Sequence, residues 1–411
     1  MTTPTTALRP IHPFPARMAP SIIQRRLKSK KSLCVVDPMA GSGTTIVASR
    51  LHGHRALGFD TDPLALLIAK AWSSDIDPDQ LRLLATRVLN NAMRRYRSIT
   101  MGRAYPKHAD EETRAFIRFW FDPTNRRQLT ALSASISSVH DAAAQAVLWC
   151  AFSRMIITKD VGVSLAMDVS HSRPHKAYDI APVTPFARFP LAVEQILRAS
   201  HFSVGSKLPK SAIRRGDARK IPLKARTADL VITSPPYVNA IDYLRGHKLS
   251  LVWMGHSVLT LRDLRSRNIG SEKFQTSSAD LERSKAAQEG INNFTGLPGR
   301  AQRMLLQYFH DMDCVLAEVS RILKRTGKAV VVVGNSTIRG IFIHNSKILT
   351  RIARKNGLDL VSARRRELKE SRRYLPPPAR HSSGAAMQSR MNEEVILVFE
   401  KRPSIARGGR Q

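Results

Sequence analysis

Short apolar runs recur along the chain and predict the strands of a buried sheet. Four of them end in turn residues or in a change to helical spacing: Leu33–Val36, Arg55–Phe59, Asp229–Thr233 and Lys328–Gly334. A continuous apolar run, without alternating polar residues, is typical of a strand buried on both faces of a parallel sheet. Two later runs, Leu358–Ala363 and Glu394–Glu400, predict a closing antiparallel hairpin.

Helices are predicted between these strands. Thr44–Leu51 follows the first run, and Tyr308–Lys324 carries apolar residues at helical spacing before Gly327, an expected helix stop. Ile348–Lys355 reads as a third helix, closed by Asn356 and Gly357. The alternation of strands and helices indicates an α/β fold with helices on both faces of the sheet.

Two segments interrupt this alternation. Residues 64–209 are too long for a simple crossover connection and predict a mostly helical insertion. Its expected helices are Leu64–Trp72, Asp79–Arg97, Glu111–Phe121, Arg126–Met155 and Phe186–Ser200. Residues 261–300 are polar and punctuated by glycine, which predicts a mobile flap. Residues 402–411 predict a disordered basic tail.

The composition limits which classes of protein the chain can belong to. The chain has 411 residues, 43% of them hydrophobic, enough for one large core or two smaller ones. No apolar run is long enough to span a bilayer, and the amino terminus lacks the apolar block of a signal peptide. Cys34, Cys150 and Cys314 lack metal-ligand spacing. We therefore expect a cytoplasmic, nucleoid-associated protein with no disulfide, no metal site and no membrane partner.

The charge is strongly unbalanced. Lys and Arg total 66 against 32 for Asp and Glu, which gives a formal net charge of +34. Such a charge repels itself unless a polyanion is bound, and it favours salt-sensitive binding to nucleic acid.

An acid and two glycines separate the first strand from the first helix. Gly41 and Gly43 let the backbone approach a ligand closely, and the helix amino terminus offers free N–H groups. The spacing is neither that of a dinucleotide site nor that of a phosphate loop, and Asp37 would repel a pyrophosphate. S-adenosylmethionine, with an ammonium, a sulfonium and no phosphate, fits better. Asp60, after the second strand, would accept hydrogen bonds from ribose hydroxyls, and Asp62 predicts a helix N-cap.

A later strand ends abruptly in Ser234-Pro235-Pro236-Tyr237. Consecutive prolines remove backbone donors and stiffen the loop. In open α/β sheets ligands bind at this edge. A hydroxyl, a carbonyl and an aromatic ring suit a planar base with an exocyclic amino group. A proline-capped strand with a surface tyrosine is the alternative interpretation.

Together these motifs resemble those of the DNA amino-methyltransferases. Asp37–Thr45 resembles the cofactor loop of that family, and Thr233–Tyr237 resembles its catalytic loop. His12–Pro20 is similar to the segment that covers the methionine part of the cofactor, and Gly216–Arg219 to the strand end that places an acid near its adenine. The resemblance covers residues 10–63 and 210–401, and Met39 departs from the more frequent phenylalanine.

The resemblance implies specific site residues. The catalytic set is Ser234, Pro235, Pro236 and Tyr237. The cofactor-binding set is His12, Pro13, Phe14, Asp37, Pro38, Ala40, Gly41, Ser42, Gly43, Thr44, Asp60 and Asp217. Serine at position 234 is common in the cytosine-N4 members, whereas adenine-N6 members more often carry an acid or asparagine.

The resemblance also implies an architecture and an activity. A seven-stranded S-adenosylmethionine-dependent methyltransferase sheet is expected from residues 1–63 and 210–401, with target recognition in residues 64–209. The cofactor loop precedes the catalytic loop, which excludes the permuted group. The implied reaction is cytosine-N4 methylation of a base flipped out of double-stranded DNA, with a restriction endonuclease as a candidate partner. Adenine-N6 methylation, RNA amino-methylation and a catalytically dead nucleic-acid-binding protein are the alternatives.

Two loops carry further candidate chemistry. Ser164–Lys176 contains two histidines and two basic residues, without a helical His pair or a cysteine pair. Contact with nucleic acid or with the active-site rim fits it better than a metal site, and an ordinary solvated loop is the alternative. Arg373–Pro378 is expected to be a stiff surface loop in which Tyr374 could touch substrate.

Overall fold

The computed structural model describes residues 8–15, 17–200, 208–238, 242–270, 294–339, 341–368 and 393–402. Three sequence predictions lie wholly or mainly outside these residues: the loop with Tyr374, most of the flap, and the tail beyond Arg402.

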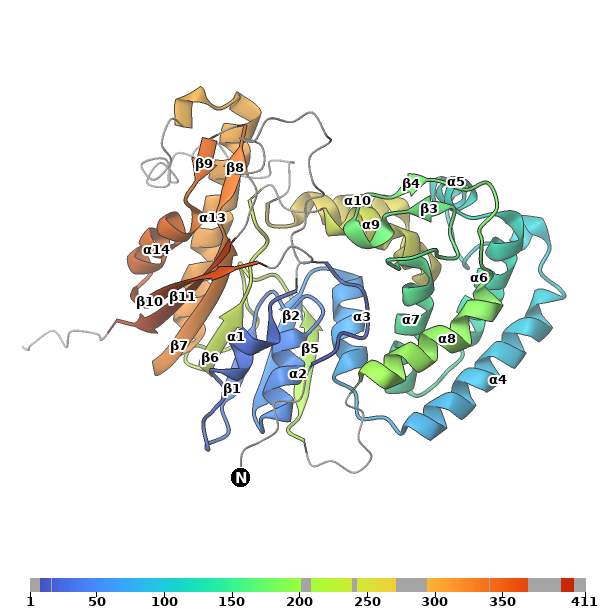
Figure 1. The fold of residues 1–411 in the computed structure, drawn as a ribbon, viewed down its shortest axis with the longest axis horizontal. Coiled ribbons are helices and arrows are strands. Elements are labelled where there is room, and N and C mark those ends of the chain that lie inside the picture. The colour runs from blue at the N-terminus through green and yellow to red at the C-terminus, as the bar shows by residue number, and fades with distance from the viewer. Residues whose placement is uncertain are drawn as a thin grey trace, which may run out of the picture.

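A seven-stranded sheet forms one half of the molecule (Figure 1). Its strands are β1 (Cys34–Asp37), β2 (Arg55–Asp60), β5 (Ser211–Arg215), β6 (Ala228–Thr233), β7 (Leu323–Gly334), β10 (Leu358–Glu367) and β11 (Glu393–Lys401). They lie in the order β10-β11-β7-β6-β1-β2-β5. The five strands from β5 to β7 are parallel, and β11 pairs antiparallel with both β7 and β10. This is the predicted S-adenosylmethionine-dependent methyltransferase sheet, and the closing hairpin is confirmed.

Helices cover both faces of the sheet because successive strand residues point to opposite sides. Val36 and Val231 pack with α13 (Gly299–Ile322) and α14 (Asn345–Lys355), whereas Val35 packs on the other face. That second face is covered by α1 (Pro20–Gln24) and α2 (Thr44–Leu51).

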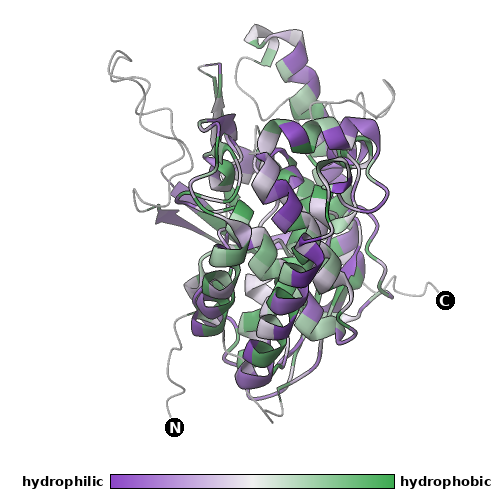
Figure 2. Ribbon diagram, turned by 90° about the vertical axis from the view of Figure 1, so that its right-hand side faces the viewer, coloured by the Kyte–Doolittle hydropathy of each residue, from purple (hydrophilic) through white to green (hydrophobic). Residues whose placement is uncertain are grey.

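The insertion is a separate helical layer beside the sheet (Figure 1). Its helices are α4 (Pro78–Tyr96), α5 (Glu111–Trp120), α6 (Pro123–Ser137), α7 (Ala142–Ile156) and α8 (Pro185–Ala199). Purple and green residues are interspersed along the helices that face the viewer in Figure 2, as expected of amphipathic helices with one face in a core. Two short strands, β3 (Ala166–Met167) and β4 (His175–Lys176), complete the layer.

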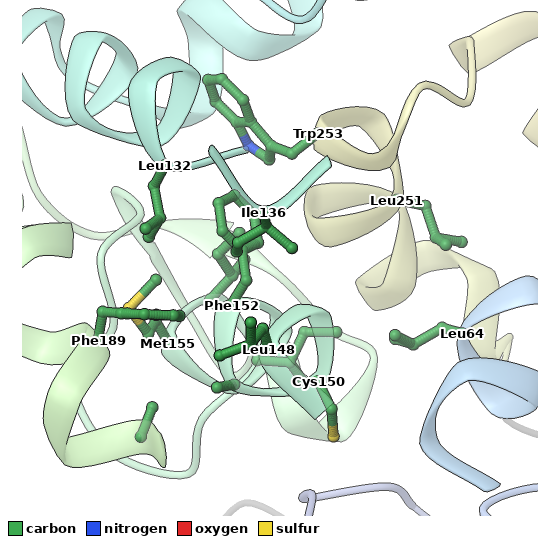
Figure 3. Close-up of a cluster of buried hydrophobic side chains, with 14 of the residues drawn as sticks. Leu64, Leu132, Ile136, Leu148, Cys150, Phe152, Met155, Phe189, Leu251 and Trp253 are labelled. Carbon is green, nitrogen blue, oxygen red and sulfur yellow. The ribbon is translucent and has the colours of Figure 1, made fainter. Parts of the chain in front are cut away.

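One continuous core joins the insertion to the sheet. Trp253 packs beside Leu132 and Phe152 at its centre (Figure 3), and Trp253 comes from the 3₁₀ helix η3 (Val252–Met254), beyond the catalytic loop. Helix α3 (Pro63–Trp72) has two apolar sides: Leu64 belongs to this core, whereas Ala69 packs with residues of the sheet. The helical layer is therefore held firmly to the methyltransferase sheet.

Three sequence predictions are wrong in detail. The single helix expected over Arg126–Met155 is two helices, because Asp141 caps a new helix by accepting hydrogen bonds from the N–H groups of Ala143 and Ala144 at 2.8 and 3.2 Å. The expected flap begins as a helix, α10 (Val258–Arg267), which Ser257 caps and Leu261 and Leu264 anchor in the core.

The third wrong prediction concerns Gly327. It lies inside β7 and does not stop a helix; α13 ends at Ile322 and the strand begins at Leu323. A Cβ on Gly327 would lie 3.1 Å from the carbonyl oxygens of Ala228 and Asp229. Close approach of β6 at a register shift is therefore the reason for glycine here. No described helix is both long and apolar enough to cross a membrane.

Candidate active site

The two predicted loops meet at the point where the strand order reverses. From β1 the chain proceeds to β2 and β5 on one side, and later to β6 and β7 on the other. In open α/β sheets the carboxyl ends of strands at such a point form a crevice. A cavity of about 440 Å³ lies here, lined by both loops. The predicted site residues in its lining are Phe14, Asp37, Pro38, Ala40, Gly41, Ser42, Thr44, Asp60, Asp217, Ser234, Pro235, Pro236 and Tyr237.

The cofactor loop folds around its acid and its glycines. Asp37 is buried, and its carboxylate accepts a hydrogen bond from the Met39 N–H at 3.1 Å, which starts the turn. Gly41 has a φ of +50°, a left-handed conformation that favours glycine. A Cβ on Gly41 would lie 3.4 Å from the ring of Phe14. The loop therefore presents bare backbone beneath an aromatic ring.

Gly43 does not line the cavity. Its φ is +87°, and a Cβ there would lie 2.8 Å from the Cβ of Ala69 in α3. Gly43 lets the start of α2 pack directly on α3, so its described contacts are with the protein itself.

Asp60 fixes the shape of the site through its own carboxylate. One oxygen accepts a hydrogen bond from the Gly41 N–H at 2.8 Å, and the other from the Asp62 N–H at 2.9 Å. Burial, and then the nearby negative charge of Asp62, raise the pKa of Asp60 to about 7. Burial likewise raises the pKa of Asp37 to about 6, against hydrogen bonding from Thr45.

The amino-terminal segment contributes only part of the expected contacts. Phe14 lines the cavity and stacks on Tyr243 with centroids 5.7 Å apart and an interplanar angle of 10°. His12 and Pro13 are absent from the lining. His12 is 1% exposed and its Nε2 lies 3.0 Å from the Ser153 hydroxyl of α7. Burial, and then the neighbouring His247, lower the pKa of His12 well below its usual value, so it is neutral.

Asp217 lines the cavity but is already paired. Its carboxylate accepts hydrogen bonds from the Arg219 Nε at 3.0 Å and from a terminal nitrogen of the same guanidinium at 2.7 Å. Burial alone would raise the pKa of Asp217, but these bonds and the charge of Arg219 hold it below its ordinary value. Arg219 also pairs with Asp311 at 2.8 Å, so the three side chains form one fixed network.

The catalytic loop is oriented by two strands of the sheet. The Ser234 hydroxyl donates to the carbonyl oxygen of Val332 in β7 at 3.1 Å. The Tyr237 hydroxyl lies 3.5 Å from a carboxylate oxygen of Glu394, a residue of β11 that is 5% exposed. Both side chains therefore reach the cavity from fixed positions.

The sequence interpretation missed one wall of the cavity. It is formed by residues of α10 and around the start of α9 (Tyr243–Leu251): Asp242, Tyr243, Arg262, Arg265, Ser266, Arg267 and Asn268. Arg17 and Met18 also line the cavity, and they lie in the amino-terminal segment that the sequence indicated. Arg262 and Arg265 stand three residues apart, the spacing of one helical face. That spacing could have revealed the helix, but the polar composition of the segment concealed it.

The residues present fit S-adenosylmethionine. Asp37 is buried and Asp60 is half-buried, and neither forms an ion pair with any residue that the structure describes. A buried carboxylate without a counter-charge is costly, and a cationic ligand removes that cost. The free lone pairs of Asp60 also suit hydroxyl donors. No group of three potential metal ligands occurs among the described residues.

Comparisons with known proteins point to methyltransferases. No family model matches the chain. Type II methyltransferase M.MvaI of Kocuria varians is 23% identical over 378 residues, which cover 84% of this chain and 80% of the relative. Type II methyltransferase M.AvaI of a Nostoc strain is 29% identical over 153 residues, 32% of this chain and 31% of the relative.

A search of solved structures adds a distant likeness. A TehB-like SAM-dependent methyltransferase from Corynebacterium glutamicum matches over 92% of this chain and 88% of its own, at 11% identity and a TM-score of 0.29.

Proposed function

The chain is a distant homologue of the type II DNA methyltransferases, and from this premise we propose that it methylates the N4 amino group of cytosine in double-stranded DNA. The resemblance to the DNA amino-methyltransferases stated from the motifs is confirmed. The observation that carries the proposal is the meeting of an acid-lined cofactor loop and the Ser234–Tyr237 loop in one cavity.

The hydrogen bond of Ser234 gives its hydroxyl a defined role. Because the hydroxyl proton is donated to the Val332 carbonyl, the remaining lone pairs of Oγ are acceptors. An exocyclic amino group is a poor nucleophile, since its lone pair is delocalised into the ring. An acceptor aimed at an amino proton favours the pyramidal nitrogen, in which that lone pair is free. Pro235 also lines the cavity, and its carbonyl oxygen would accept a hydrogen bond from the second amino proton.

Tyr237 would hold the base. Its ring lines the cavity, and its hydroxyl is anchored to Glu394, so the ring has a fixed plane on which a base can stack. A base within a duplex cannot reach such a cavity, so the target must be flipped out.

Asp37 and Asp60 would hold the cofactor, the first on its cationic end and the second on its ribose. S-adenosylmethionine, when bound, would supply an activated methyl group for transfer to the amino nitrogen, whose proton would pass to solvent. The protein's contribution is mainly positioning, which alone can supply several kcal/mol of a barrier. We further propose that His12, Pro13 and Gly43 support the cofactor site from outside the cavity lining.

The proposal of cytosine as the target base rests on the hydrogen-bond acceptor at position 234, which is a serine hydroxyl. A hydroxyl is a weaker acceptor than the carboxylate or amide that adenine-N6 enzymes more often carry. Adenine N6 is the alternative product.

The helical segment, residues 64–209, would select the target sequence, with the sheet performing the chemistry. A cognate restriction endonuclease is the proposed biological partner. Replacing residues 77–200 with the equivalent segment of a relative should change the methylated site and preserve cofactor binding, because α3, which packs on the sheet, is retained. If the methylated DNA sequence stays the same after this exchange, residues 261–300 become the proposed target-recognition segment.

Methyl transfer from labelled S-adenosylmethionine to purified nucleic acids tests the proposal. Duplex DNA of mixed sequence should become labelled, and transfer RNA and ribosomal RNA should not. The Ser234→Ala variant should bind the cofactor but transfer label on the order of 10²-fold more slowly. Label in RNA alone would establish the RNA enzyme instead, and cofactor binding without transfer to either would indicate a catalytically dead protein.

A further inference from the structure

The segment of residues 168–176, which comprises the loop after β3 and the strand β4, docks tightly on helix α9. Its 3₁₀ turn η2 (Val169–His171) buries Val169 to 3% exposure. A Cβ on Gly246, inside α9, would lie only 2.6 Å from the Val169 carbonyl oxygen. Glycine is unfavourable inside a helix, so this close approach gives a physical reason for its presence. Figure 1 shows β3, β4 and α9 at the same end of the helical layer.

This contact places the loop beside the cavity. The Ser172 hydroxyl lies 3.4 Å from the carbonyl oxygen of Tyr243, the first residue of α9. Tyr243 lines the cavity and stacks on Phe14. A single residue therefore separates the loop from the space where we place the flipped base.

The backbone of the loop is held in an uncommon shape. Asp168 and Ser172 both have φ values of +56°, which non-glycine residues seldom adopt. The carbonyl of Asp168 accepts hydrogen bonds from the N–H groups of His171 at 3.1 Å and Arg173 at 3.2 Å. Strain held in place by docking and hydrogen bonds is typical of binding loops, which gain affinity from a fixed shape.

The loop displays both donors and an acceptor to solvent. The side chains of His171 and His175 are each 59% exposed, and their Nδ1 atoms lie 3.6 and 3.8 Å from the Asp168 carboxylate. Arg173 is exposed, and its guanidinium has no ion pair or hydrogen bond with any residue in the described ranges. A site built for phosphate would not include an exposed acid. Base edges in the major groove offer both donors and acceptors, which this mixed set matches.

An exposed aromatic ring completes the surface. Phe119, at the end of α5, is 54% exposed, and the Lys176 ammonium lies 6.0 Å from its ring centre. An apolar ring among hydrogen-bonding groups suits the methyl group of thymine.

We propose that residues 168–176 read bases of the recognition site next to the flipped base, with Arg173 as the principal specificity-determining side chain. This inference rests on the proposed function, because it assumes DNA as the substrate. It assigns recognition of the target sequence to one loop that packs on α9, instead of to the whole helical segment.

The test first requires the DNA sequence that the full-length protein methylates. Single-molecule sequencing of DNA from a methylase-free host expressing the chain identifies this sequence. Purified Arg173→Ala should then bind a duplex with that site about 10- to 100-fold more weakly, the range expected for one lost bidentate base contact. Its affinity for a duplex without the site should stay unchanged, and sequencing should show methylation at sites that differ by one base.

Matched variants separate this role from a structural one. Arg173→Lys should fail to restore discrimination, because lysine lacks the planar fork of arginine. Arg87→Ala, which removes an exposed arginine of α4 outside the cavity lining, should behave as the parent does. Gly246→Ala, which displaces the docked loop, should lose discrimination and keep its thermal shift with S-adenosylmethionine.

Two results would overturn the inference and leave the proposed function intact. The first is parental discrimination in Arg173→Ala. The second is equal weakening on both duplexes, which would indicate a phosphate contact. If the parent protein methylates no DNA, the proposed function fails first and this inference fails with it.

Discussion

At the scale of single residues, the site is defined by two acids with raised pKa values. Burial raises the pKa of Asp37 to about 6 and that of Asp60 to about 7. An acid with a raised pKa in the folded state favours folding most at low pH, and this contribution is lost as pH rises through the folded value. At neutral pH both groups therefore destabilise the free protein, and a cationic ligand with hydroxyl donors would relieve that cost.

The pH dependence of cofactor binding follows from these acids. Below pH 7 Asp60 becomes protonated, and binding a ligand that prefers the carboxylate then requires losing that proton. We expect S-adenosylmethionine to bind roughly tenfold more weakly at pH 5.5 than at pH 7.5, since each pKa unit corresponds to about 1.4 kcal/mol. Calorimetry at the two pH values measures the difference. Asp60→Asn should bind weakly at both, and equal parental affinity at the two pH values would contradict the assigned role of Asp60.

Ser234 and Tyr237 should affect turnover and leave cofactor affinity unchanged. Ser234→Ala removes an acceptor aimed at the amino group, so the methylation rate should fall on the order of 10²-fold, as for loss of one oriented hydrogen bond in other enzymes. Tyr237→Ala should act similarly, whereas Tyr237→Phe keeps the stacking ring and should lose much less. Single-turnover rates and cofactor affinity measured together check this. Loss of cofactor affinity in Ser234→Ala would contradict the role in turnover that we assign to this serine.

At the scale of elements, the sequence predicted those helix and strand ends at which one or two residues determine the backbone conformation. The prolines after Thr233 end β6, and the cap at Asp62 starts α3, where the structure has them. The break between α6 and α7 was missed because the apolar pattern continues across it. The basic wall of the cavity was missed because α10 is anchored by only a few apolar residues within a polar segment. Its position over the site depends on packing with distant parts of the chain.

Two glycines allow a test of how α2 packs on α3. Gly43→Ala combines a φ of +87° with a Cβ 2.8 Å from Ala69, so it should lower the free energy of unfolding by about 2–4 kcal/mol. Gly53→Ala shares the positive φ, +79°, but meets nothing within 4 Å, and should cost only about 1 kcal/mol. Urea unfolding of both variants measures the difference. Equal losses would show that backbone strain alone explains glycine at position 43.

At the scale of the whole molecule, the net charge and the arrangement of the sheet and the helical layer both suit DNA as the substrate. The chain has a formal net charge of +34, and the acids Asp37 and Asp60 are among the residues that line its cavity. The acids suit a cationic cofactor, and the basic exterior suits a polyanion. The helical layer, α3 and the residues after the catalytic loop share one core, and α3 also packs on the sheet, so DNA bound across both halves would meet surfaces that are held together.

Salt should separate the two kinds of binding. If the protein contacts 6–10 phosphates, DNA affinity should fall about 10³- to 10⁵-fold between 50 and 200 mM salt. Cofactor affinity should change far less, because Asp37 is buried and Asp60 is half-buried, so both are weakly screened. Fluorescence anisotropy with a labelled duplex and calorimetry with the cofactor measure the two responses. DNA affinity that is insensitive to salt would contradict a phosphate-binding surface.

The identity of the methylated base tests the central claim most directly. Mass spectrometry of nucleosides from the DNA of a methylase-free host, expressing either the parent chain or Ser234→Ala, gives this identity. We predict N4-methylcytosine with the parent and much less of it with the variant. N6-methyladenine without N4-methylcytosine would contradict the assignment of the base, and the absence of both modified nucleosides in DNA would contradict the proposed function itself.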